Sequence, residues 1–104
     1  FGREIRNKPR FKSKGINVNF VENGNHSNIR TYERGVEAET LSCGTGVTAS
    51  AIAVFIAKKT TQTHLEVQTL GGLLKVDFNS GVNRFDNIVL HGPTKMVFSG
   101  TIQL

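Results

Sequence analysis

The sequence predicts an α+β domain in which a curved, mostly antiparallel sheet or barrel wraps around one central hydrophobic helix. Residues 45–57 read TGVTASAIAVFIA, and from Ala49 onward only Ser50 is polar until Lys58. Several segments on either side of this run alternate apolar and polar side chains, as half-buried strands do. A helix that is apolar all round must be buried all round, so we expect strands on every side of it.

The remaining elements follow from alternation and from turn residues. A helical segment over residues 2–8 is expected to end at Pro9. We expect a turn around Gly24 and a two-residue turn at Gly71-Gly72. The predicted strands are residues 16–22, 29–33, 64–70, 73–78, 87–92 and 95–100, with residues 100–104 extending the last.

Composition places the chain among ordinary single domains. It has 104 residues, 38% of them hydrophobic and 20% charged. No run approaches the ~18 apolar residues of a membrane span, and no leader pattern suggests secretion, so a cytoplasmic protein without a membrane partner is expected. The first residue is Phe1 rather than methionine, which suggests a processed chain or a piece of a longer one.

The net charge of +5 is concentrated at the N-terminus. A basic arm of this kind could bind nucleic acid through phosphates. The segment has few aromatic residues and no recognisable nucleic-acid motif, so we favour a solvated surface, or one whose acidic counterpart lies in a missing part of the protein. The basic residues are Arg3, Arg6, Lys8, Arg10, Lys12 and Lys14.

The single cysteine, Cys43, stands directly before the predicted hydrophobic helix and has no partner for an internal disulfide. The field at a helix start lowers the pKa of a thiol and makes the thiolate available. Gly44 and Gly46 remove side chains beside it, so that an anion such as a carboxylate could reach the first backbone amides. A free cysteine can also be an inert small hydrophobic residue, but its place between these glycines favours function.

Three common thiol chemistries fit poorly. A cysteine hydrolase needs a histidine partner, and His26, His64 and His91 are scattered without a motif. A disulfide oxidoreductase normally carries a second cysteine, and a metal site needs more ligands. Acid–base work at a carbon next to a carboxylate remains. Inversion at that carbon needs one group on each face, and the chain supplies one.

The segment YERGVEAETLSCGTGVTASA, residues 32–51, resembles the second active-site segment of the diaminopimelate epimerases. INVNFVE, at 16–22, is similar to an asparagine-bearing strand of that family, and HGPTKMVFSG, at 91–100, to its closing strand. The resemblance covers most of the chain from Asn17 onward.

The resemblance implies a two-domain enzyme whose pseudo-symmetric halves each wrap a strand barrel around a helix. Residues 1–104 would be the second half, and the first half, with the other catalytic cysteine, would be missing. The enzyme would interconvert L,L- and meso-diaminopimelate for lysine and peptidoglycan precursor synthesis, without a metal or pyridoxal phosphate. A homodimer is left open.

The resemblance also implies roles for individual residues. Cys43 would be one of two acid–base thiols, and the amides of Gly44 and Thr45 would hold the carboxylate at the reacting centre. The distal amino-acid end of the substrate would be recognised by Asn17, Glu33 and Arg34. A guanidinium suits a carboxylate because its donors form a planar fork.

Two other readings stay open. A related cofactor-independent racemase or isomerase, such as a proline-racemase-like enzyme, would share the fold and one cysteine. The combination of Asn17, Glu33 and Arg34 argues against it, because the resemblance to the epimerases implies that these residues serve a second amino-acid end. Alternatively, the chain is a binding or assembly fragment without activity. Under the epimerase reading, we expect the isolated chain to be inactive.

Overall fold

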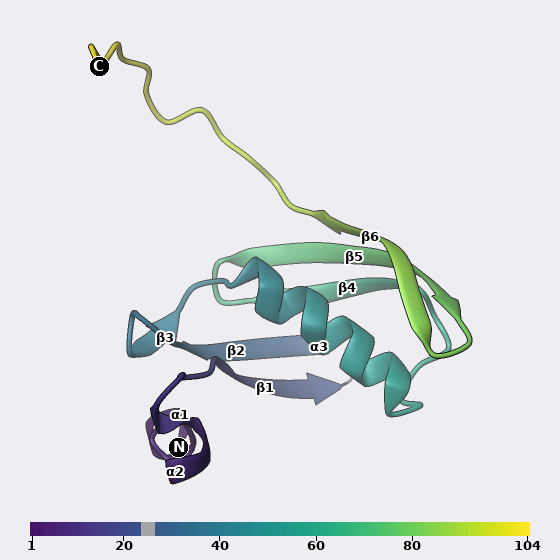
Figure 1. Cartoon of the computed structure of the whole chain (residues 1–104). Helices are drawn as coiled ribbons and strands as arrows, with labels where there is room; N and C mark the ends of the chain where they lie inside the picture. The colour runs from purple at the N-terminus through teal and green to yellow at the C-terminus, as the bar shows by residue number, and fades with distance from the viewer. Residues whose placement is uncertain (24–26) are drawn as a thin grey trace.

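The computed structural model of the protein describes residues 1–23 and 27–104 (Figure 1). The turn predicted around Gly24 and the side chain of His26 lie outside these residues. The elements are α1 (Gly2–Arg6), α2 (Pro9–Lys12), β1 (Val18–Asn23), β2 (Ser27–Glu33), β3 (Ala38–Thr40), α3 (Gly44–Ile56), β4 (His64–Thr69), β5 (Gly72–Gly81) and β6 (Arg84–His91).

The strands form one mixed sheet, and α3 lies across one of its faces (Figure 1). Its order is β1-β2-β4-β5-β6, and β3 pairs with β2 off this path. Neighbouring strands are antiparallel except β2 and β4, which are parallel. The connection explains this parallel pair. The segment between β2 and β4 contains α3, and this crossover lets the chain enter β4 running in the same direction as β2. The α+β class predicted from the sequence is confirmed.

The core lies between α3 and the sheet. Val47 and Ala51 from the helix are fully buried, as are Val67 and Val76 from β4 and β5. Phe78 extends this core and packs edge-to-face against two neighbouring aromatic rings. These contacts fix the helix axis, and hence the place of its N-terminus.

Burial of the helix on all sides was expected, and within the described residues this is wrong. Ile56 is 62% exposed, and Ala49 and Ala53 are exposed as well. The described strands form an open sheet with β1 and β6 at its edges, so they cover one side of α3. An all-apolar sequence predicts that the whole surface of a helix favours burial. How much of that surface is buried depends on how many strands pack against the helix.

The N-terminal helix is shorter than expected. It ends at Arg6, and Pro9 opens α2 instead of closing α1. Proline suits the first turn of a helix, where its missing N–H leaves no hydrogen bond unmade. Arg6 pairs with Glu37 at 3.2 Å, so this part of the basic segment has an acidic partner within the chain.

The first hairpin after α3 differs in register from the prediction, and the two strands that follow the Gly71 turn begin or end at other residues than predicted. Thr69 pairs with Gly72, so the loop is Leu70-Gly71 rather than Gly71-Gly72. β5 continues to Gly81, and β6 begins at Arg84. The turn between them is possible because Asn83 takes a left-handed φ of 53°.

Residues 92–104 form no strand, so the strands predicted at 95–100 and 100–104 are wrong. This segment extends away from the sheet (Figure 1) and leaves apolar side chains such as Phe98 84% exposed. Alternation favours a strand, but a strand forms only where another backbone is present to pair with it. None of the described helices is long and apolar enough to span a membrane.

Candidate functional site

Cys43 is the N-cap residue of α3. Its backbone is extended, with φ −136° and ψ 105°, and its carbonyl accepts the first helical hydrogen bond, from the amide of Val47 at 2.9 Å. The amides at the helix start have no intrahelical acceptor, and they carry the positive end of the helix dipole. The buried thiol therefore stands where an anion would be favoured.

Two side chains contact the sulfur. Asn17 Nδ2 donates to Sγ at 3.7 Å, and Thr45 Oγ1 lies 3.4 Å from it. The other end of the same amide, Asn17 Oδ1, accepts from the backbone N–H of Arg34 at 2.9 Å. Asn17 thus joins the thiol to the residue that follows β2, across two segments that are distant in the sequence.

An open hollow of about 740 Å³ lies beside the thiol. It is lined by Glu33 from the end of β2, by residues of the first three turns of α3, and by a residue of β6. Its lining residues are Glu33, Ser42, Cys43, Gly44, Thr45, Thr48, Ala49, Ile52 and Leu90. Among the predicted site residues, four therefore share this hollow, and Asn17 touches the thiol directly.

Arg34 is the exception. Its guanidinium Nη1 donates to the backbone carbonyl of Lys14 at 2.8 Å, and the residue does not line the hollow. Its backbone is fixed by Asn17, next to Glu33. The structure thus brings the Arg34 main chain to the site and leaves its charged group outside the hollow.

The glycines after the thiol were expected to leave room for a ligand, but protein side chains occupy that room. A Cβ at Gly44 would lie 2.8 Å from Cδ2 of Leu90, and one at Gly46 would lie 2.6 Å from Oδ1 of Asn19. That Asn19 oxygen accepts a hydrogen bond from the buried Thr31 hydroxyl at 2.8 Å. Packing explains both glycines, since their absent side chains let β1 and β6 approach the helix start.

The two glutamates that precede the cysteine have cationic partners of their own. Arg30 Nη2 donates to Glu39 Oε2 at 2.6 Å, and this hydrogen bond lowers the pKa of the Glu39 carboxyl. Glu37 pairs with Arg6. In the part of the chain that the structure describes, no group of three or more His, Cys, Asp or Glu residues could hold a metal ion.

Sequence reasoning missed several lining residues. Thr48 and Ile52 follow Thr45 at helical spacing on the same face of α3, and that spacing could have identified them. Leu90 carried no such signal. It reaches the hollow because β6 pairs with β5 and places residue 90 opposite Val76.

A thiol at a helix start, held by an amide side chain beside an open hollow, defines a domain suited to anion binding and acid–base work. Comparison with known proteins makes the assignment specific. Residues 1–97 match the diaminopimelate epimerase family, and the chain belongs to it.

Similar proteins include three enzymes named diaminopimelate epimerase. The chain is 47% identical over 103 residues to that of Flavobacterium psychrophilum, covering 97% of this chain and 40% of the relative. For Methanocella arvoryzae the identity is 46%, covering 97% and 34%, and for Aquifex aeolicus 41%, covering 97% and 36%. The chain therefore spans about a third to two fifths of the length of these relatives.

The packing at Gly46 generates a prediction of stability. Helix propensity alone would make Gly46→Ala stabilising by up to ~1 kcal/mol. We expect it instead to destabilise by about 1–3 kcal/mol, because the new Cβ displaces the Asn19 amide from buried Thr31. Urea unfolding of the purified chain measures this difference.

Gly100→Ala is the control, since nothing lies within 4 Å of a Cβ at that position. If the Asn19 contact is the cause, Gly46→Ala should cost less in an Asn19→Ala background. A Gly46→Ala chain as stable as the parent would contradict the packing explanation.

Proposed function

We propose that the intact protein containing this chain is a diaminopimelate epimerase, which interconverts the L,L and meso isomers. The observation that carries this proposal is the position of Cys43. Its sulfur lies at the start of α3, within reach of Asn17, in a chain of this family. The substrate in this proposal is the one for which the relatives are named.

The proposed reaction removes one proton from the α-carbon and adds another from the opposite face. A thiolate removes the α-hydrogen from one face of the carbon, and a thiol on the opposite face returns a hydrogen to it. Cys43 takes one of these roles for each isomer, and the amides of Gly44 and Thr45 hold the adjacent carboxylate. The charge that develops beside that carboxylate then faces the positive end of α3. No step of the proposal passes through a metal or a cofactor.

The opposite thiol belongs, in this proposal, to the part of the protein that precedes the chain. Two observations support a site completed by a further domain. The hollow beside Cys43 is open, and the relatives are more than twice as long as this chain. Residues 1–104 then form the second half of the enzyme, and the substrate lies between the halves.

Recognition of the distal amino-acid end is assigned to Asn17, Glu33 and Arg34. The half-buried residue Glu33 lines the hollow, and its carboxylate would offer an acceptor for an ammonium group. Arg34 has five N–H donors, and its Nη1 donates to the backbone carbonyl of Lys14. Reorientation of this side chain toward the hollow would let it bind a carboxylate through two parallel hydrogen bonds.

Replacing the thiol tests the assignment of Cys43. In the intact protein, Cys43→Ala should reduce epimerisation by at least the ~10²–10⁴-fold that a positioned acid–base group contributes. Cys43→Ser should lose inversion similarly, because an alkoxide is far harder to form at neutral pH. The two measurements are α-proton exchange in D₂O and optical rotation, each started from a single isomer.

The serine variant adds a sharper readout. If the second thiol still removes and returns a proton on one face, exchange from one isomer should outlast inversion. A Cys43→Ala enzyme that inverts within a few-fold of the parent rate would make Cys43 a packing residue.

The 104-residue chain alone should not epimerise diaminopimelate, because one thiol cannot serve both faces of the carbon. Optical inversion of the L,L isomer by the purified chain measures this. Turnover that survives extensive purification and disappears in Cys43→Ala would show that this domain suffices, and would overturn the two-half proposal.

Arg34→Lys tests recognition of the distal end. In the intact protein we expect kcat/KM for diaminopimelate to fall by about tenfold or more, because a point ammonium cannot reproduce the planar fork. The matched control is Arg30→Lys, which changes an exposed arginine of β2 paired with Glu39. Parental kinetics for Arg34→Lys, or an equal loss in both variants, would remove Arg34 from the site.

A further inference from the structure

Two histidines that are far apart in the sequence share one carboxylate. His64 Nδ1 lies 2.8 Å from Asp77 Oδ1, and His91 Nε2 lies 2.7 Å from Asp77 Oδ2. The three residues come from β4, β5 and β6, which are neighbours in the sheet. We call this arrangement the Asp77 bridge.

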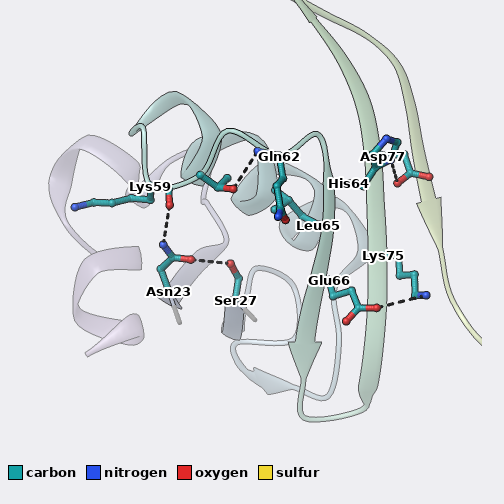
Figure 2. Close-up of a pocket in the computed structure, with 10 residues that line it drawn as sticks. Asn23, Ser27, Lys59, Gln62, His64, Leu65, Glu66, Lys75 and Asp77 are labelled. Atoms are coloured by element: carbon teal, nitrogen blue, oxygen red, sulfur yellow. Dashed lines mark hydrogen bonds and ion pairs between the residues drawn. The ribbon is translucent and has the colours of Figure 1, made fainter. Parts of the chain in front are cut away.

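The bridge lies on the face of the sheet that points away from α3. Figure 2 shows His64 and Asp77 side by side, with the ion pair of Glu66 and Lys75 on the same two strands. These groups border a hollow of about 520 Å³ that also receives Lys59 from the segment after α3. Asp77 thus lies next to the imidazoles of β4 and β6, and the ion pair of Lys75 with Glu66 and the Lys59 side chain border the same hollow.

The bridge ties down the end of an edge strand. His91 is the last residue of β6, and Lys75 is its backbone partner on β5. Among the described residues, β6 has no strand on its other side, and no regular structure follows it. The contact of His91 with Asp77 is therefore a side-chain interaction at the residue where the backbone pairing of β5 with β6 ends.

The residue before His91 reaches the thiol site on the opposite face of the sheet. Leu90 lines the hollow beside Cys43, and its Cδ2 occupies the space above Gly44. Side chains of adjacent strand residues point to opposite faces, so one backbone segment carries both the tie and the wall of the hollow. Any movement at the end of β6 moves Leu90 relative to the helix-start amides.

We propose that Asp77, with His64 and His91, is a positioning residue of the thiol site, which it serves by holding Leu90 against the start of α3. The inference rests on the proposed function, because the hollow it shapes is the one assigned to the substrate carboxylate. Asp77 itself lies on the other face of the sheet and touches no reacting atom.

The charge on the bridge gives it a pH dependence. The hydrogen bond from His64, and then that from His91, lowers the pKa of Asp77 below its ordinary value. A lowered carboxyl pKa stabilises the fold above the ordinary value, and this contribution is lost as the pH falls through the lowered one.

The test is Asp77→Asn in the intact protein. We expect KM for diaminopimelate to rise by about two- to fivefold with little change in kcat, since an exposed charged contact is worth at most a factor of this size. Hydrogen exchange of β6 amides, followed by mass spectrometry without substrate, should be faster in the variant.

A double-mutant cycle with Leu90→Ala tests whether Asp77 affects the thiol site through Leu90. If Asp77 acts through Leu90, Asp77→Asn should change KM less in the Leu90→Ala background than in the parent. The matched control is Glu66→Gln, which neutralises a carboxylate of β4 on the same face and leaves the bridge intact.

Additive effects in the cycle, or a Glu66→Gln effect equal to that of Asp77→Asn, would overturn the inference. So would an active parent whose KM is unchanged by Asp77→Asn. An inactive parent protein would instead overturn the proposed function, and the inference with it.

Discussion

The packing of α3 on the sheet is the constraint on which the site depends. Val47 and Ala51 are buried against Val67 and Val76, and these contacts fix the direction in which the helix starts. Because Cys43 is the N-cap, the same packing fixes the thiol at the positive end of the helix. Core and site are therefore not separable, since a shift of the helix along the sheet would carry the sulfur and the first amides together.

Polar contacts then attach neighbouring segments to that helix start. Asn17 connects the sulfur to the backbone of Arg34, and Asn19 fills the space beside Gly46. On the other side, Leu90 fills the space beside Gly44. The contacts of Asn19 and Leu90 depend on the absence of a side chain at Gly46 and Gly44. The glycines that suggested room for a ligand therefore also allow the neighbouring strands to pack against the helix start.

Much of the candidate site was readable from the sequence because its residues lie in two short segments. Glu33, Cys43 and Thr45 occur within a single stretch, and a helix start can be placed from local pattern alone. Leu90 and the partners of Asp77 were not readable. Their positions depend on which strands pair and in which register. Registers that differ by two residues place the same side chains on the same face, so the apolar–polar alternation cannot distinguish them.

The sequence by itself determined the α+β class, the hydrophobic helix and the cysteine at its start, because propensity, period and dipole are local properties. Tertiary structure alone decided that one side of α3 remains uncovered and that residues 92–104 form no strand. It also decided that the guanidinium of Arg34 points to Lys14 and that His64 and His91 meet at Asp77. These outcomes depend on whether a partner backbone or side chain from elsewhere in the chain is present, and local pattern carries no information about that.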